Sequence, residues 1–405
     1  MKKNDIICFA GNLYDQKPWT NRQQIMTKLS EIGYRVIYIE PPKNIIYQFI
    51  KLILNIKQEQ KVIKWFKRLI RLEKRKKNLY LFSLIKILPI KYRNFRKINY
   101  LFYCYFLKRK FSQIQIKNPI LWIYTPDAVV FAGKFGELLL CYDCVDKYDE
   151  QPYYKKNFKE IEKDEIELLK KADLVFTSSK NLYEDKKKYN NNTYLVHNVG
   201  DYNHFIKTTY IETKIPEDII RISSPRIGFV GSIDDYKLDI ELLLYLSKQR
   251  PNWSIIMIGP EGVADKKIST YILRQYENIY FLGKRDYELL PNYLKGLDVL
   301  IIPYKNNEYT RNCFPIKIFE YLASGKPVVV SGLPELERYK DIIGFAYDYE
   351  MFVRLVESFL KNDTQYQKEK RMKLAKENTW EKKVEKEIEI IEEFIKHKIN
   401  NENRN

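Results

Sequence analysis

Residues 315–330 read PIKIFEYLASGKPVVV, a proline, a stretch of mixed apolar and charged residues, a glycine and a run of valines. Pro315 can open a helix, because proline is tolerated in the first turn, and Gly325 is placed to end it. Val328, Val329 and Val330 then suit a buried strand. The stretch predicts a helix that begins beyond the carboxyl end of the strand at 299–302, where its free N–H groups can bind a phosphate.

The same alternation of short apolar runs and longer helical patterns extends along the whole chain, which is typical of parallel sheets covered by helices. Strands are predicted in two groups, at Ile6–Ala10, Arg35–Ile39, Ile120–Tyr124, Leu138–Tyr142, Leu174–Thr177 and Tyr194–Val196, and then at Arg226–Val230, Ser254–Ile258, Ile279–Leu282, Val299–Ile302, Val328–Val330 and Gly344–Tyr347. We therefore predict an α/β fold of two doubly wound, Rossmann-like domains whose strand ends face each other across one cleft.

The boundary between the domains is predicted in a polar stretch without sustained periodicity, which contains Pro216 and Pro225. The expected division is a first domain at 1–205, a linker at 206–225, a second domain at 226–375, and a helix with a tail at 376–405. With 405 residues and 45% hydrophobic residues, the chain can bury a core in each domain.

The segment 43–117 holds 21 Lys and Arg against two Glu, which equals the net charge of +19 of the entire chain. Within it, Val62, Phe66, Leu69 and Ile70 recur at helical spacing among lysines and arginines, as in a basic helix that lies in a membrane interface. An anionic membrane surface is the expected partner, and no nucleic acid is expected. The alternative is a helix that covers its own domain and solvates its charges.

Several other classes of protein find little support in the sequence. The five cysteines are an odd number in a long chain without a secretory signal, which favours reduced thiols and a cytoplasmic location. No stretch approaches the roughly 20 apolar residues of a spanning helix. Three histidines, no Asp-x-Asp and no Walker loop leave no visible metal ligands or cofactor motif, so neither a metal nor a cofactor is expected.

Two loops of the second half are candidates for binding a phosphorylated ligand. Lys317 and Glu320 lie three residues apart on one helix face, where the lysine could neutralise a diphosphate and the carboxylate could accept two ribose hydroxyls. An intrahelical salt bridge explains the same spacing equally well. The second loop, GSIDDYK at 231–237, follows a strand, so that Gly231 lets the backbone approach a ligand and Lys237 could reach a phosphate.

In the first half, Asp143 and Asp146 stand at the end of a predicted strand, and one of them could act as general base on an acceptor hydroxyl. Capping of the next helix is the alternative reading. Trp19 and Arg22, near the start of the first helix, could face the same cleft.

The order of these pieces resembles that of bacterial GT-B glycosyltransferases of the large family 4 type, and more narrowly that of the teichuronic-acid-biosynthesis glycosyltransferases. The matching pieces are WTNRQQI, YIEPP, YDCVD, ADLVFTSSKNL, NVGDYNHF, GFVGSIDDYKLD, IIMIGP, YFLGKRDYELLPNYL, DVLIIPY and FPIKIFEYLASGKPVVV. The resemblance implies that Glu320 binds the donor ribose and that Lys317 and Lys237 contact the diphosphate.

The resemblance also implies that the loop from Gly283 to Arg285 lies near the nucleotide base and that Trp380 belongs to a C-terminal helix that crosses back onto the first domain. A looser similarity to xanthan glucuronosyltransferases adds Tyr304 on the donor side and Asp146 as the base. In two places the chain departs from the pattern of the family. Asn312, on the donor side, stands where the family usually has a glutamate, and Ser232 stands where it usually has an arginine. Whether the transfer retains or inverts the configuration of the sugar therefore stays open.

The resulting prediction is a glycosyltransferase that moves a sugar from a nucleoside diphosphate donor, UDP foremost, to a glycan or lipid-linked acceptor of the cell envelope at the inner face of the plasma membrane. Two alternatives remain at this point. One is a non-catalytic module of the same fold that binds a membrane or a nucleic acid through 43–117. The other is an enzyme with a different reaction on the nucleotide sugar, such as epimerisation.

Overall fold

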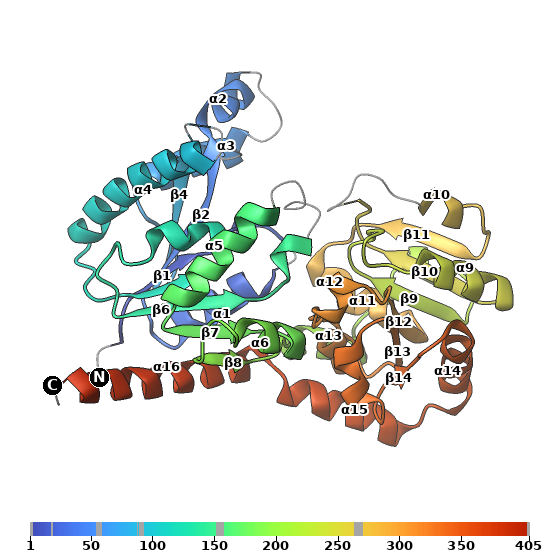
Figure 1. Ribbon diagram of the computed structural model, residues 1–405. Helices are drawn as coiled ribbons and strands as arrows, with labels where there is room; N and C mark the ends of the chain where they lie inside the picture. Colours follow the sequence, from blue (N-terminus) through green and yellow to red (C-terminus); the bar gives the residue numbers. More distant parts are fainter. Residues whose placement is uncertain are drawn as a thin grey trace.

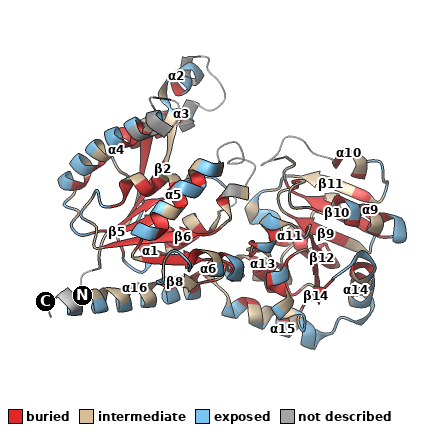
Figure 2. Cartoon of the chain, in the orientation of Figure 1, coloured by how far each residue is buried: buried red, intermediate tan, exposed pale blue. Residues whose placement is uncertain are grey.

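The computed structural model shows two α/β lobes side by side (Figure 1). It describes residues 3–17, 19–53, 59–86, 88, 93–150, 158–262 and 270–402. Figure 2 shows that the strands of both lobes are buried while the helices expose their outer faces. This is the arrangement expected for sheets that are covered by helices on both sides.

The first lobe is built on an eight-stranded sheet of order β3-β4-β2-β1-β5-β6-β7-β8. Its strands are parallel except for β3, which pairs antiparallel with β4 at the edge. All six strands predicted in this half are present. The strands of the sheet are β1 (Ile6–Phe9), β2 (Val36–Asn44), β3 (Glu73–Lys76), β4 (Leu79–Lys86), β5 (Ile120–Ile123), β6 (Leu139–Cys144), β7 (Leu174–Thr177) and β8 (Thr193–Leu195).

Alternate residues of these strands face opposite cores, as the two-residue period of a strand requires. Ile6 and Cys8 lie in one core and Ile7 and Phe9 in the other. The first core is covered by α1 (Asn21–Glu31) and by α16 (Trp380–Glu402), and the second by α4 (Arg93–Gln113), η1 (Pro126–Phe131) and α5 (Phe158–Lys171). The short elements η2 (Tyr148–Glu150) and α6 (Lys180–Lys186) complete the lobe.

The basic segment 43–117 is more than an insertion between two strands. It supplies β3 and β4, which extend the sheet, as well as α2 (Ile45–Ile53), α3 (Glu59–Ile70) and α4. The prediction that the apolar side of the helix at 62–70 faces a membrane is wrong. Val62 and Leu69 are only 3% and 7% exposed, because α3 packs on β4. The side chain of Ile70 lies outside the described residues.

The second lobe has a parallel six-stranded sheet of order β11-β10-β9-β12-β13-β14, and the six strands predicted there are confirmed. The strands are β9 (Arg226–Val230), β10 (Ser254–Ile258), β11 (Ile279–Gly283), β12 (Val299–Pro303), β13 (Val328–Ser331) and β14 (Gly344–Phe345). The helices are α9 (Ile240–Gln249), α10 (Thr270–Leu273), η5 (Tyr287–Leu289), α11 (Leu290–Lys295), α12 (Glu308–Arg311), α13 (Lys317–Ala323), η6 (Pro334–Tyr339), α14 (Tyr349–Asn362) and α15 (Gln365–Glu377).

The predicted linker is folded against the second lobe. It follows α7 (Tyr202–Phe205) and contains η4 (Ile206–Thr209) and α8 (Glu217–Ile220). Ile219 and Ile222 are buried in the core of the second lobe, together with Phe205. The segment 206–225 therefore moves with the second lobe rather than acting as a free tether.

The chain returns to the first lobe through α16, which runs along its lower side in Figure 1. Trp380 and Val384 are buried in the first lobe's core. Lys383 and Glu387 form a buried ion pair at 3.1 Å, and Lys383 Nζ also donates to the carbonyl of Val196 at 2.8 Å. The crossing helix implied by the resemblance is thereby confirmed. No helix within the described ranges is long and apolar enough to cross a membrane.

Candidate active site

The donor side of the site lies at the carboxyl ends of β9 and β12, the edge of a parallel sheet where ligands bind in doubly wound folds. The loop 231–237 follows β9, and Tyr304 follows β12. An isolated bridge between Leu238 and Tyr304 ties these two loops together. The helix α13 begins at Lys317, two residues later than predicted from Pro315, and ends before Gly325, which has a φ of 75°.

Lys317 is the first residue of α13 and is packed among aromatic rings. Its Nζ lies 4.1 Å from the ring centroid of Phe229 and 5.4 Å from that of Tyr304. A side chain at Gly231 would overlap that Nζ, which explains why a glycine stands there. Burial lowers the pKa of Lys317 to about 7, and the positive charge of Lys237 contributes to the shift. A bound anion near such an amine raises the pKa of the amine and so favours its charged form.

Glu320 follows one turn later and faces the segment that leaves the first lobe. A Cβ on Gly200 would lie 2.8 Å from the backbone nitrogen of Glu320, so this segment rests directly on α13. Burial raises the pKa of Glu320 to about 8, with a further rise from the carboxylate of Asp201. Among the ion pairs of the described residues, none joins Lys317 to Glu320, so the salt-bridge alternative does not hold.

Lys237 completes the cationic side of the site. Its Nζ lies 3.4 Å from Oδ2 of the buried Asp234, which holds the side chain at the end of the loop. Ser232, which replaces the arginine usual in the family, donates its hydroxyl hydrogen bond to the same carboxylate. The local arrangement therefore differs from the family pattern while keeping one positive charge, that of Lys237, beside Lys317.

Asp146 lies beyond the end of β6 and reaches the second lobe. The hydroxyl of Tyr309, on α12, donates a hydrogen bond to Asp146 Oδ1 at 3.3 Å. Asp143, the other candidate base, is 1% exposed and lies beneath α16 near Lys383, and burial raises its pKa. The structure thus places Asp146, and not Asp143, at the interface between the lobes.

The thiol of Cys313 marks the point where these groups converge. Burial raises its pKa to about 12, the negative charge of Asp146 raises it further, and the positive charges of Lys237 and Lys317 lower it. Packed tyrosine rings connect the candidate base to the cationic side of the site. The ring of Tyr309, which binds Asp146, lies 4.9 Å from that of Tyr236, and Lys237 Nζ lies 5.4 Å from the Tyr236 ring centroid.

The remaining donor-side candidates are more dispersed. Asn312 is buried, its amide donates to the carbonyl of Glu308 at 2.8 Å, and its own carbonyl accepts from Ser179 of the first lobe at 2.9 Å. Arg285 donates to Asp218 and to the hydroxyl of Tyr293, so its guanidinium is occupied by the segment 206–225. Gly283 has a φ of 70° and open space around it.

Two further candidates belong to the first lobe. Arg22 donates to the hydroxyl of Tyr148 at 3.0 Å and faces the ring of Tyr124. Trp19 is covered by Lys17, whose Nζ lies 4.2 Å from the indole and 5.7 Å from the ring of Tyr287 in the second lobe.

Four residues of the site were not predicted from the sequence: Asp201, Tyr287, Tyr309 and Cys313. Their place in the site depends on burial or on contact between the lobes, which the local sequence does not show. Only Asp201 and Tyr287 lie within the pieces quoted for the family resemblance. Tyrosine is too common in this chain for its type to single out a position.

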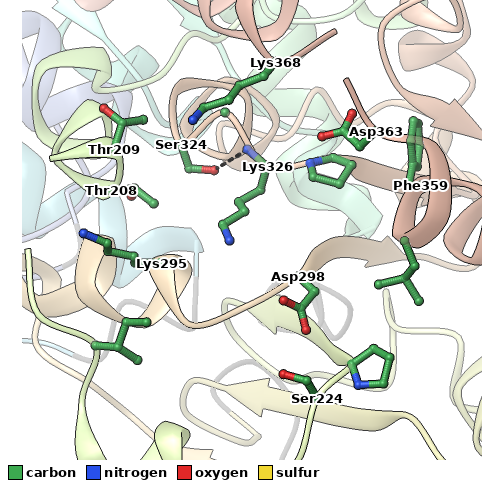
Figure 3. A pocket seen from close by; sticks show the side chains of 15 residues that line it. Thr208, Thr209, Ser224, Lys295, Asp298, Ser324, Lys326, Phe359, Asp363 and Lys368 are labelled. Atoms are coloured by element: carbon green, nitrogen blue, oxygen red, sulfur yellow. Dashed lines mark hydrogen bonds between the residues drawn. The ribbon is translucent and has the colours of Figure 1, made fainter. Parts of the chain in front are cut away.

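A larger cavity, of about 740 Å³, lies at the opposite edge of the second sheet. Figure 3 shows Lys326 pointing into it, with Lys295, Lys368 and Asp298 around it. Asp298 precedes β12 and Lys326 precedes β13, so the cavity opens at the amino ends of the strands. Position at the carboxyl ends, rather than size, therefore identifies the candidate donor site.

Two Rossmann-like lobes with facing strand ends are the arrangement of the GT-B fold. Residues 212–379, within the second lobe and its linker, match the glycosyl transferases group 1 family. The enzyme class that this match indicates is that of the glycosyltransferases.

Among individual proteins, the chain is 27% identical over 277 residues to TuaH of Bacillus subtilis, described as a teichuronic acid biosynthesis glycosyltransferase. That match covers 64% of this chain and 68% of TuaH.

Solved structures with the same fold include sucrose-phosphate synthase from Thermosynechococcus elongatus, with a TM-score of 0.70, 13% identity, and coverage of 98% of this chain and 100% of that one. The E. coli trehalose-6-phosphate structure bound with UDP-2-fluoro glucose has a TM-score of 0.67 and 11% identity, over 97% of this chain and 99% of that one.

Proposed function

We propose that the protein transfers a sugar from a UDP-sugar to a hydroxyl group of a cell-envelope glycan or its lipid-linked precursor. The hydrogen bond from Tyr309 to Asp146 carries this proposal, since it brings a carboxylate of the first lobe to the lobe that holds Lys237 and Lys317. The UDP-2-fluoro glucose of the E. coli neighbour supports UDP as the carrier. The description of TuaH supports an envelope polysaccharide as the product class.

In the proposed mechanism, Lys317 and Lys237 stabilise the negative charge that grows on the departing diphosphate. The carboxylate of Glu320 accepts the two ribose hydroxyls, and Tyr304 fixes the position of Lys317. The two lysines carry the leaving-group charge, so the proposal includes no metal ion or cofactor. The short length of α13, seven residues, leaves most of that stabilisation to the side chains.

Asp146 is the proposed general base, which takes the proton of the acceptor hydroxyl as the new glycosidic bond forms. Tyr309 binds its carboxylate from the second lobe, so contact between the lobes helps to position the base. The ion pair between Lys147 and Glu308, at 2.6 Å, strengthens the same contact. Approach of the lobes therefore couples donor binding to readiness for the chemical step.

The protein is also proposed to lie on the inner face of the plasma membrane. The support comes from α4, whose exposed apolar side chains recur at helical spacing, and not from α3 as the sequence indicated. The exposed fractions of Ile98, Leu101 and Tyr105 are 52%, 69% and 70%. Lysines and arginines of the basic segment would add attraction to anionic lipid of about 1 kcal/mol each.

Leu101→Glu is expected to release the protein from vesicles that contain anionic lipid, since it places a negative charge in the middle of that stripe. The measurement is sedimentation with vesicles. Ile211→Glu is the matched control, because Ile211 is 97% exposed on the second lobe. Unchanged sedimentation of the Leu101 variant would remove α4 as the contact.

A panel of nucleotide sugars tests the donor assignment, with thermal stabilisation of the purified protein as the readout. A UDP-sugar should stabilise the protein, and free UDP should appear only when an acceptor is added. Release of UDP without acceptor, or conversion of the sugar while it stays attached to UDP, would favour another reaction. Salt-dependent binding of DNA without any affinity for nucleotide sugars would favour the non-catalytic module.

The affinity for UDP-glucose is expected to be greatest between about pH 7 and pH 8. Glu320, with a pKa of about 8, is protonated below pH 7 and must lose its proton to bind the ribose, so below pH 7 the affinity rises with pH.

Lys317, with a pKa of about 7, is neutral above pH 8 and must gain a proton to bind the diphosphate, so above pH 8 the affinity falls as pH rises.

Isothermal calorimetry in buffers of different ionisation enthalpy measures these protons directly. Release at pH 6.5 and uptake at pH 8.5 are expected, and Glu320→Gln should abolish only the release. The same proton count at both pH values would contradict the assignment of the two groups.

A further inference from the structure

A second cavity of about 720 Å³ lies in the first lobe, apart from the residues that surround Cys313. Its walls are the loop between β1 and α1, the end of β2, and residues of α3 and β3. The carboxyl ends of β1 and β2 open on the same edge of the sheet as that of β6, which leads to Asp146. The cavity is therefore on the acceptor side of the enzyme.

The lining of this cavity is strongly cationic. Six of the lining residues are basic and two are acidic, a net charge of +4, and the basic ones are Lys17, Lys43, Lys64, Arg68, Arg75 and Lys76. A cavity with this charge and partly apolar walls attracts anions and concentrates the field inside it. A neutral sugar alone would not account for it.

The two acidic residues are already compensated by arginine. Buried Arg68 binds Glu40 at 2.8 Å and Asp15 at 2.7 Å, and Arg75 binds the other oxygen of Asp15 at 2.7 Å. Lys64 has no ion-pair partner within the described part of the chain and is exposed at the cavity wall. Arg68 also binds Glu73 at 2.7 Å, and Lys76 binds Glu31 at 3.1 Å. The positive charge that remains for a ligand is therefore held mainly by Lys17 and Lys64, with Arg75 able to share its guanidinium.

Aromatic rings form the apolar part of the wall. Trp19 and Trp65 both line the cavity, and their indole N–H groups are buried away from it. The polar groups that a ligand can reach are therefore the charged side chains.

Its position links the cavity to both neighbouring surfaces. Lys17, at one end, approaches the ring of Tyr287 in the second lobe. At the other end, α3 packs against α2, which exposes Ile46 and Ile50 by 65% and 45%. The cavity therefore lies between the second lobe and an apolar surface of the first.

We propose that this cavity binds a phosphate or diphosphate group of the acceptor, with Lys64 and Arg75 as its main ligands. The inference rests on the proposed function and adds to it the chemical class of the acceptor and two specificity residues. The basic segment then serves two purposes, because it forms the phosphate cavity as well as the surface of α4. The shared chemistry is a phosphate, which either a lipid carrier or a soluble sugar phosphate can supply.

The test measures binding of inorganic pyrophosphate by calorimetry while saturating UDP-glucose occupies the donor site. We expect binding with one site per chain, and a weakening of about 10- to 100-fold in the double variant Lys64→Gln, Arg75→Gln. Lys108→Gln is the matched control, since Lys108 is an exposed lysine of the same segment on α4, and it should bind as the wild type does.

A second arm uses a short-chain prenyl diphosphate under the same conditions. Tighter binding than that of pyrophosphate identifies a lipid carrier as the source, and equal binding identifies a soluble phosphate. The inference is overturned if neither probe binds or if the double variant binds as well as the wild type. Failure of UDP-glucose itself to bind would instead contradict the proposed function, so the two failures are distinguishable.

Discussion

Lys317→Ala is expected to weaken the binding of UDP-glucose by about 10- to 100-fold, which corresponds to the loss of one charge-assisted contact with a diphosphate. The side chain is enclosed by Gly231 and by the rings of Phe229 and Tyr304, and the neighbouring cation Lys237 is held by Asp234. Lys317→Met, which keeps most of the volume, should show the same loss and so separates charge from packing.

Calorimetry measures this effect, and thermal unfolding reports whether each variant is folded. Lys368→Ala provides the matched control, because Lys368 lines the cavity at the opposite edge of the same sheet. Removal of Lys317 should also raise the pKa of Glu320 further, since the lysine is the group that lowers it. Unchanged donor affinity in the folded Ala and Met variants would remove Lys317 from the diphosphate site.

Asp146→Asn should lower kcat by about 100- to 10,000-fold while the affinity for the donor stays the same. Asparagine keeps the shape of the side chain and an oxygen that can accept from Tyr309, but it cannot take a proton. The measurement is UDP release in the presence of acceptor, together with calorimetry for the donor.

Two further variants sharpen that result. Tyr309→Phe removes the hydrogen bond to Asp146 Oδ1 and the contact of the same hydroxyl with Tyr236 but leaves the carboxylate in place, so it should have a smaller effect on kcat. Asp341→Asn, an exposed carboxylate on the second lobe, should have none. A parallel fall of kcat and donor affinity in Asp146→Asn would assign this residue to binding instead of proton transfer.

The sequence allowed every strand of the two central sheets to be predicted except β3 and β4. The predicted strands are buried on both faces and are therefore short apolar runs, which stand out from their surroundings. The run at 79–86 is just as apolar, but it lies in a segment dominated by lysine and arginine, and no strand was predicted there. Pairing with β2 decides its conformation, and that pairing is not visible in the local pattern.

The donor-side candidates could be proposed from the sequence because they lie in segments that connect predicted strands. Lys237 lies between β9 and β10, and Lys317 and Glu320 lie between β12 and β13. The partners of Asn312 and Arg285 could not be foreseen, since Ser179 lies in the other lobe and Asp218 lies 67 residues away in the segment 206–225. The same limit applies to α3, because the sequence of its apolar side does not distinguish packing against lipid from packing against β4.

The return of α16 to the first lobe has a consequence for the order in which the protein folds. Asp143 is buried in the first lobe, and Lys383 is the main positive charge that favours its ionised form. During synthesis the first lobe emerges complete in its strands but without this helix, so Asp143 and the apolar groove that receives Trp380 and Val384 are left uncovered. The domain that is made first can therefore reach its final state only after the second has been made, and a chaperone would find its binding surface there.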